Sequence, residues 1–299
     1  MEHIRGNSYY LPSQVVIGGY KVDDTLILFD SGNDDSSARK AIRDFESINV
    51  IAVFNTHSHA DHCGGNQYLQ RQFSAAVYAP IIENAFIEAP ILEPTYLYGA
   101  YPMKALQNKF LMARPSKVVH LIEDESPITI TVNGANHVIK PISLRGHSPN
   151  QYGYITPDGI AYLGDALIAE EMVDKHPLIF TYDVTEHYQS LEKLKTLVAN
   201  GYVIAHGGYY ESIEGLIHAN IEALDLTQNL IKQKISQGQC TFDGLHKHLA
   251  ETYDLHENLG QNLLNRSVLK AHVRHLVDLG KLVLEVENGM ILIKENPVL

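Results

Sequence analysis

The segment 54–65, FNTHSHADHCGG, restricts the fold of this chain more than any other part of its sequence. Within six positions it places three histidines and an aspartate: His57, His59, Asp61 and His62. In a helix these side chains would point around much of the cylinder, because each residue turns by about 100°. As an extended continuation of the apolar run VIAVFN, at 50–55, the chain directs His57 and His59 to the same side. A turn after His59 then makes Asp61 and His62 a second pair, so we expect two neighbouring metal positions at the end of a strand.

Gly64 and Gly65 follow this motif and precede NQYLQRQF, which is expected to start a helix. Glycine accepts backbone conformations that other residues avoid, so the pair suits a tight turn. The alternative is a polar loop that is rich in histidine by chance. Four ligand-type side chains in six positions at a strand end make that alternative weak.

The first two thirds of the chain read as a layered α/β body over roughly residues 1–210. Short apolar runs predict strands at 25–30, 50–55, 75–79 and 202–206, with helical spacing between the first two and again at about 185–199. Asn133-Gly134 and Asp158-Gly159 are hairpin signals within the segment 117–164. Strands mixed with helices favour a sheet body that helices cover on the outside.

The last third has a different pattern. ESIEGLIHANIEALDLTQNLIKQKISQ predicts one long amphipathic helix, and two shorter helices are expected at 241–253 and 266–281. The run LVLEVENGMILI then contains the hairpin signal Asn288-Gly289. Helix, helix and two-stranded wing is the outline of a winged helix. We therefore expect a catalytic domain at 1–212, a connecting helix at 213–238 and a small winged-helix-like domain at 239–299.

The segment 87–116 has no clear secondary-structure pattern. Prolines interrupt its periodicity, and four aromatic residues are spread along it: Tyr96, Tyr98, Tyr101 and Phe110. It is either an ordinary surface excursion or a lid over an active site.

Three further residues follow predicted strands and could complete a metal site. His147 lies in LRGHSPN, Asp165 in AYLGDAL and His206 in VIAHGGYY. Ligand sites in layered α/β proteins gather beyond strand ends, so these segments could meet at one edge. Each residue alone is weak support for a metal site, but with the first cluster they supply the four or five donors that zinc requires.

The order HxHxDH, then GHS, then GD, then a strand-terminal histidine resembles the metallo-β-lactamase-fold hydrolases. That family includes glyoxalase II, lactonases and RNase Z-like nucleases. The resemblance spans residues 57–206 and implies an αββα sandwich. It also implies the ligands of two metal ions, with Asp165 between them: His57, His59 and His147 for one ion, and Asp61, His62 and His206 for the other.

A dinuclear centre of this kind is typical of a hydrolase. Two cations lower the pKa of a bridging water, so that a hydroxide nucleophile is available near neutral pH, and they polarise the attacked oxygen. Asp61 would take a catalytic role by orienting that hydroxide. Imidazole and carboxylate ligands suit zinc and also manganese or iron. Cys63 is expected to be a small packed residue, because the site is full without it. The resemblance extends to persulfide dioxygenases, so a mononuclear-iron dioxygenase is a weaker alternative.

We expect the substrate to be a small ester, lactone or thioester, with the segment 87–116 as an apolar wall and Tyr209 as a donor to a substrate oxygen. An endoribonuclease is the alternative, because the tail resembles the winged helix of lactamase-β-like endoribonucleases. Arg266, Lys270 and Arg274 share one helical face. Residues 239–299 nevertheless contain six basic and eight acidic residues, and the net charge of the chain is −12, so nucleic acid is disfavoured. A non-catalytic sensor is a third hypothesis, and the complete ligand set argues against it.

The remaining expectations come from composition. The two cysteines, Cys63 and Cys240, exclude a disulfide framework, and 45% apolar residues support a full core. No apolar run is long enough to cross a bilayer and the start lacks the features of a secretory signal, so we expect a cytoplasmic protein without a membrane partner. The appended tail suggests a homodimer.

Overall fold

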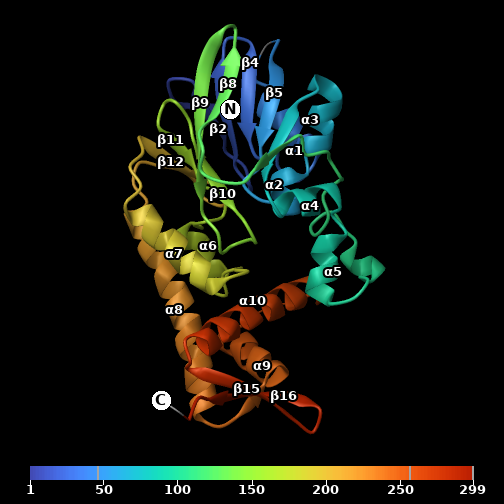
Figure 1. Ribbon diagram of the computed structural model, residues 1–299, viewed down its shortest axis with the longest axis vertical. Coiled ribbons are helices and arrows are strands. Elements are labelled where there is room, and N and C mark those ends of the chain that lie inside the picture. Colours follow the sequence, from blue (N-terminus) through green and yellow to red (C-terminus); the bar gives the residue numbers. More distant parts are fainter. Residues whose placement is uncertain (46, 256, 298–299) are drawn as a thin grey trace.

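The computed structural model describes residues 1–45, 47–255 and 257–297. Two sheets form the larger part of the molecule (Figure 1). In the described residues the first sheet follows chain order: β1 (Glu2–Arg5), β2 (Ser8–Leu11), β3 (Ile17–Val22), β4 (Thr25–Phe29), β5 (Asn49–Phe54), β6 (Ala76–Pro80) and β7 (His120–Ile122). Its first four strands are antiparallel, and β4 to β7 are parallel.

The second sheet has the order β13-β12-β11-β10-β9-β8. Its strands are β8 (Ile128–Val132), β9 (Ala135–Ser143), β10 (Tyr152–Ile155), β11 (Ile160–Tyr162), β12 (Gly201–Ile204) and β13 (Gly208–Tyr210). Both predicted hairpins are confirmed, since β8 pairs with β9 and β10 pairs with β11 in antiparallel register. β11 and β12 run parallel, which brings the ends of both strands to one edge.

The sheets pack face to face with helices outside them, which confirms the αββα sandwich. Strand β4 shows why: Ile27 and Phe29 enter the cluster between the sheets, while Leu26 and Leu28 enter the cluster under the outer helices. This alternation follows from the period of two in a strand. Helices α1 (Asp35–Ile42) and α3 (Asn66–Phe73) cover the first sheet, whereas α7 (Val184–Lys195) and α8 (Glu214–Ser236) cover the second.

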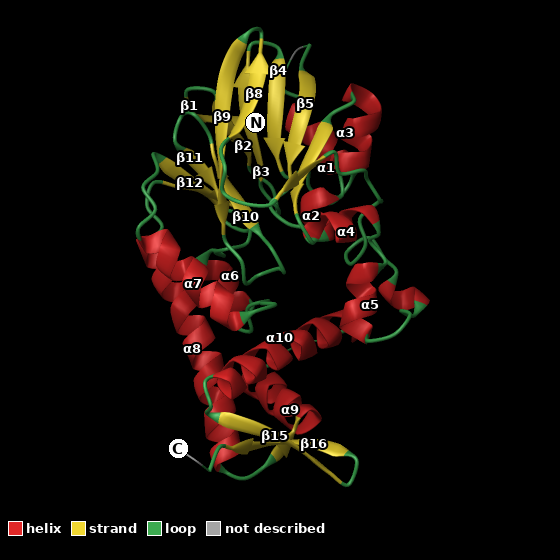
Figure 2. Ribbon diagram, viewed as in Figure 1, coloured by secondary structure: helices red, strands yellow, loops and turns green. Residues whose placement is uncertain are grey.

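Four further helical segments in the first two thirds of the chain are short. They are α2 (Ala60–Cys63), α4 (Glu83–Glu88), α5 (Leu92–Tyr98) and α6 (Glu170–Lys175), with a 3₁₀ turn η1 (Lys104–Leu106) after α5. Figure 2 shows α2 and α4 below the first sheet and α5 further towards the C-terminal region. The segment 87–116 is thus partly helical, although its prolines interrupt the helical periodicity of the sequence.

The C-terminal region is carried by α8, which continues away from the sheets (Figure 1). It contains β14 (Cys240–Thr241), α9 (Phe242–Thr252), α10 (Leu259–Asp278), β15 (Leu282–Glu287) and β16 (Met290–Glu295). The predicted hairpin at Asn288-Gly289 is confirmed, and β14 adds a strand that was not predicted. The helix–helix–hairpin order is therefore present, while the winged-helix classification and the domain boundaries stay predictions. Residues 256, 298 and 299 of the predicted third domain lie outside the described part.

Helix α10 begins at Leu259, earlier than the predicted start at residue 266. The Asn258 side chain caps it by accepting a hydrogen bond from the Gln261 amide. Asn265 lies in this added part of the helix and is buried although it is polar.

Helix α10 contacts two helices outside the C-terminal region, α5 and α7. Leu263 and Leu264 pack against a cluster in the segment 87–116 that contains Leu97, Leu106 and Leu111. Tyr101 and Phe110 of that segment remain 78% and 73% exposed. The segment is therefore attached to the C-terminal region through its apolar side chains. None of the helices in the described residues combines the length and the apolar character needed to span a membrane.

Candidate metal centre

Side chains from four chain segments meet beyond the ends of strands in both sheets. His57 and His59 follow β5, His147 lies between β9 and β10, Asp165 follows β11 and His206 follows β12. Three overlapping groups of ligand atoms result, and within each group all the atoms lie within 4.8 Å of one another: His57, His59 and His147; His57, His62 and Asp165; Asp61, His62 and His206. The structure thus brings together all seven residues that the sequence suggested.

The first group consists of imidazoles only. The Nδ1 atom of His59 lies 2.9 Å from Nε2 of His57 and 3.0 Å from Nε2 of His147. Burial and the neighbouring His62 and His59 lower the pKa of His57 well below its ordinary value. Burial likewise lowers the pKa of His147 to about 3. Both rings are therefore neutral at pH 7, which is the form that binds a divalent metal.

The partners of the outer ring nitrogens determine where the lone pairs point. The Thr56 hydroxyl donates to Asp30, so its oxygen accepts the Nδ1 hydrogen of His57 at 3.0 Å. Nδ1 of His147 donates to the Phe180 carbonyl at 3.2 Å. In both neutral rings the Nε2 lone pair must then point into the centre.

The group of Asp61, His62 and His206, called the second group from here on, contains the Asp61 carboxylate and is more open to solvent. Oδ2 of Asp61 lies 3.5 Å from Nε2 of His206, and Oδ1 lies 4.0 Å from Nε2 of His62. The Asp61 side chain is 33% exposed and that of His206 is 21% exposed, whereas His62 is fully buried. This side of the centre is therefore the one open to water.

Charge dominates the titration of the second group. The negative charge of Asp165 raises the pKa of His206 to about 10. Burial alone would lower the pKa of His62, but Asp165, Asp30 and Asp61 together raise it well above its ordinary value. Burial alone would raise the pKa of Asp61, yet His62 and His206 lower it to about 2. The carboxylates thus attract positive charge into this group, as they would attract a cation.

Asp165 lies between the two groups. Its Oδ2 is 3.4 Å from Nε2 of His147 and 3.3 Å from Nε2 of His206, while its Oδ1 is 3.4 Å from Nε2 of His62. Two of these buried atoms, Nε2 of His62 and Oδ1 of Asp165, have no hydrogen-bond partner. A buried polar atom without a partner is costly. Converging lone pairs, carboxylates and orphaned atoms together fit divalent metal ions.

The local backbone agrees with the sequence prediction at the motif and differs from it at the two glycines. The chain turns after His59, as expected, and the turn is the short helix α2, which carries Asp61 and His62. Gly64 and Gly65 have ordinary right-handed backbone angles and are not needed for an unusual turn. A Cβ at Gly64 would lie 2.0 Å from the Asn33 carbonyl oxygen, so glycine is required there by close packing.

Asp30 is a partner of the centre that the sequence interpretation missed. It accepts hydrogen bonds from the Thr56 amide, the Thr56 hydroxyl and Nδ1 of His62, all at 2.8 Å. A signal was available, because Asp30 directly follows the apolar run TLILF, as Asp165 and His206 follow theirs.

Glu93 on α5 was missed as well. Its Oε1 lies 3.9 Å from Nε2 of His59. Burial raises the pKa of Glu93 to about 6, and Tyr96 donates a hydrogen bond to it. The Tyr96 ring in turn contacts those of Phe86 and Tyr182. The segment 87–116 therefore reaches the centre through a carboxylate, which its position in the sequence did not suggest.

Tyr209 is not brought into the centre. Its ring lies 6.3 Å from that of Tyr10 and packs against the cluster between the sheets. This packing does not support the predicted role of Tyr209 as a donor to a substrate oxygen. Cys63 is buried, and its thiol donates to the Ser58 carbonyl at 3.2 Å, in agreement with a packing role.

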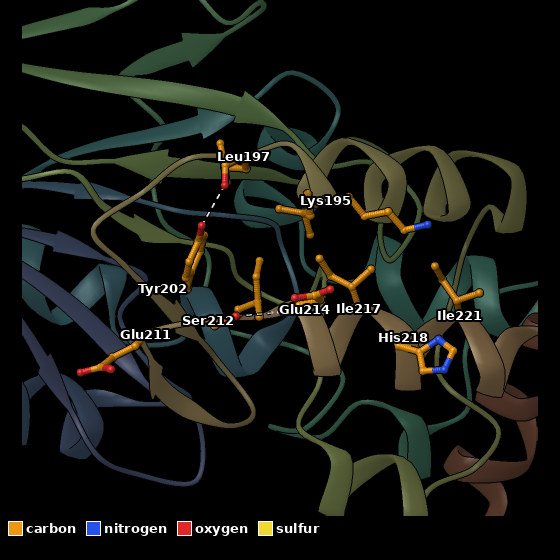
Figure 3. A pocket seen from close by; sticks show the side chains of 11 residues that line it. Lys195, Leu197, Tyr202, Glu211, Ser212, Glu214, Ile217, His218 and Ile221 are labelled. Atoms are coloured by element: carbon orange, nitrogen blue, oxygen red, sulfur yellow. Dashed lines mark hydrogen bonds between the residues drawn. The ribbon is translucent and has the colours of Figure 1, made fainter.

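A cavity of about 650 Å³ lies elsewhere, between the end of α7 and the start of α8. Figure 3 shows Lys195, Glu214 and His218 at this cavity, with the Tyr202 hydroxyl bonded to the Leu197 carbonyl. None of its lining residues belongs to the histidine and aspartate groups. It is therefore separate from the candidate metal centre.

The αββα sandwich with clustered donors beyond its strand ends defines a class of metal-dependent hydrolases. Residues 11–206 match the metallo-beta-lactamase superfamily. The chain therefore belongs to that superfamily.

Individual relatives are more distant. A hydroxyacylglutathione hydrolase from Shewanella pealeana is 27% identical over 195 residues, which are 62% of this chain and 60% of that protein. The match thus covers less than two thirds of the relative's length. A metallo-beta-lactamase family protein from Thermus thermophilus has a TM-score of 0.73 at 16% identity, covering 97% of this chain and 98% of that one. A beta-lactamase domain protein from Burkholderia ambifaria has a TM-score of 0.68 at 16% identity, covering 96% and 90%. These two structures share the fold.

Proposed function

We propose that this chain uses a dinuclear metal centre, occupied by two zinc ions, to hydrolyse a small ester, lactone or thioester. One observation carries the proposal: donors from both sheets converge, and Asp165 lies 3.3 to 3.4 Å from the nitrogens of three histidines. We assign one ion to His57, His59 and His147 and the other to Asp61, His62 and His206, with Asp165 shared. Manganese or iron is compatible with the same donors.

When bound, the two ions would supply an activated water and would polarise the substrate oxygen. The chain orients these partners. Asp61 is partly exposed, so its carboxylate can accept a hydrogen bond from the attacking water. Asp30 and Thr56 fix the rings of His62 and His57 from behind.

The comparisons support an acyl substrate. The Shewanella relative is named for the hydrolysis of an acylated glutathione. A single-iron dioxygenase receives less support, because the donors of the second group are present and close together. The complete donor set likewise counts against a non-catalytic sensor.

The contacts of α10 count against nucleic acid as the partner. Arg266 pairs with Asp243, and Arg274 pairs with both Asp183 and Asp278. Two of the three basic side chains on the predicted recognition face are therefore already neutralised within the chain. A cytoplasmic location and a homodimer stay predictions.

A substrate panel tests the proposed function. Purified protein loaded with zinc is assayed against short acyl esters, lactones, acyl thioesters, a phosphodiester and single-stranded RNA, and bound metal is measured in the same sample. We expect two zinc ions per chain and turnover of at least one acyl substrate. Cleavage confined to RNA or the phosphodiester would make the nuclease the better assignment, and no turnover at full metal content would favour the sensor.

A further inference from the structure

Glu83, the first residue of α4, is a fully buried carboxylate outside the seven donors. Four hydrogen bonds end on it. Oε2 accepts from the amide of Ser58, at 3.0 Å, and from the Ser58 hydroxyl. Oε1 accepts from the Ser148 hydroxyl at 2.7 Å and from the Asn150 amide at 2.8 Å. Each carboxylate oxygen therefore holds a different stretch of chain.

The two stretches carry the first donor group. Ser58 stands between His57 and His59, and Ser148 directly follows His147. These segments belong to different sheets and are distant in sequence, since His59 and His147 are separated by 88 positions. Glu83 thus connects the two loops that bring Nε2 of His147 to 3.0 Å from Nδ1 of His59.

The backbone before Glu83 supports a special role for its position. Ile82 has φ 79° and ψ −53°, a conformation that β-branched residues rarely adopt. Its side chain is half exposed, so burial of that side chain does not hold it there. The adjacent Ile81 carbonyl accepts a hydrogen bond from the Asn150 side chain at 2.9 Å. A strained backbone conformation of this kind persists where surrounding contacts impose it. Here the contacts on both sides of Ile82 come from Asn150 in the His147 loop.

We propose that Glu83 is a positioning residue that sets the separation of the His57–His59 loop and the His147 loop, and thereby the affinity of the first metal position. This inference rests on the proposed function, since it assumes a metal ion at those three histidines. The second donor group has a different anchor: Asp30 bonds directly to His62. Loss of the Glu83 carboxylate should therefore weaken one metal position and spare the other.

Glu83→Gln is a sharp test because glutamine keeps the size of the side chain but only one acceptor oxygen. Its amide group would face donors from one of the two loops, whichever way it turns. Glu88→Gln is the matched control on the same helix, because Glu88 is exposed and its one bond, from the Val118 amide, can be kept by glutamine. Glu257→Gln in the C-terminal region is a second control, since it disturbs a partly buried carboxylate far along the chain from the centre.

The measurement is a zinc titration of stripped protein in competition with a chromophoric chelator, together with unfolding midpoints for each variant. We expect two zinc ions in the wild type. In Glu83→Gln one of them should bind about 10-fold to 100-fold more weakly while the other is nearly unchanged. Both control variants should bind two ions as the wild type does, even where Glu257→Gln lowers the unfolding midpoint.

Two outcomes separate the inference from the proposed function. Two unchanged zinc affinities in folded Glu83→Gln overturn the positioning role and leave the dinuclear centre intact. A wild type that binds no zinc overturns both. If Glu83→Gln does not fold, Ser148→Ala removes a single bond to Oε1 and should still weaken one of the two affinities; equal affinities in that variant also overturn the inference.

Discussion

Two clusters of buried polar side chains, one at the metal centre and one in the C-terminal region, differ in how their atoms are satisfied. Around Glu257, the carboxylate accepts hydrogen bonds from His246, Asn262 and Asn265, and Gln261 donates to Asn265. At the metal centre, Nε2 of His62 and Oδ1 of Asp165 are buried without a partner. Both regions therefore bury histidines and carboxylates. What indicates a cation at the metal centre is that its buried ligand atoms converge and two of them lack a hydrogen-bond partner.

The largest expected effect separates these clusters by activity. Asp165→Ala or His59→Ala should lower turnover by roughly 1,000-fold or more, because each removes a donor that holds or shares a metal ion. The variants should remain folded by circular dichroism. His246→Ala, the control in the other cluster, should keep kcat/KM close to the wild-type value. Unchanged activity in metal-analysed Asp165→Ala protein would refute the ligand assignment.

For the free energy of unfolding, we expect the larger effect from a substitution in the C-terminal cluster. Glu257→Ala leaves the donors of His246, Asn262 and Asn265 without their shared acceptor, inside a partly buried site. We expect the free energy of unfolding to fall by about 2 to 4 kcal/mol, measured by urea denaturation. The zinc content of the folded variant should not change. A loss of metal in this variant would show that the two clusters are coupled and would break the contrast between them.

A pH dependence is expected from His272, which is buried in the C-terminal region. Burial lowers its pKa to about 3, and its Nδ1 lies 2.7 Å from the Gln228 side-chain nitrogen. Below the ordinary histidine pKa of about 6.5 the unfolded chain takes up a proton that the folded chain refuses. The free energy of unfolding should therefore fall with acidification, by up to about 1.4 kcal/mol per pH unit between pH 6.5 and pH 3 from this residue.

His272→Asn isolates that contribution, because asparagine offers an acceptor to Gln228 and does not titrate. Urea unfolding at pH 7.0 and 5.5 gives the slope for each protein. The wild type should lose more stability than the variant across this interval, even if the variant starts from a lower value. Equal losses would mean that His272 takes up a proton in the folded state.

The sequence predicted the donors of the metal centre because they lie near the ends of apolar runs that are recognisable as strands. Strand ends have recognisable apolar runs, and His147, Asp165 and His206 each come within a few residues after one, so their convergence could be expected from the fold. Glu83 and Glu93 could not be found in this way. Each lies on a short helix in an irregular segment, and each meets its partners through contacts between loops that are distant in sequence.

The same limit applies to Gly64 and Asn265. Gly64 is required by the approach of the Asn33 carbonyl, a contact that no local pattern encodes. Asn265 is buried because it bonds to Glu257, whereas the apolar periodicity of a helix suggests a polar residue on the surface. Local patterns therefore predicted the layers and the donors, and missed the residues that hold them in place.

The smallest expected effect concerns the basic residues of α10. Arg266 and Arg274 pair with Asp243, Asp183 and Asp278 on a largely exposed surface, and such pairs contribute at most about 1 kcal/mol each. We expect Arg266→Ala/Arg274→Ala to change the unfolding free energy little and to leave RNA retention at low salt as weak as in the wild type. Lys270→Ala is the control, because Lys270 is the exposed third member of the same face. Salt-sensitive RNA binding by the wild type that disappears in the double variant would reverse the order of acyl and nucleic-acid substrates, since these arginines would then exchange their aspartates for phosphates.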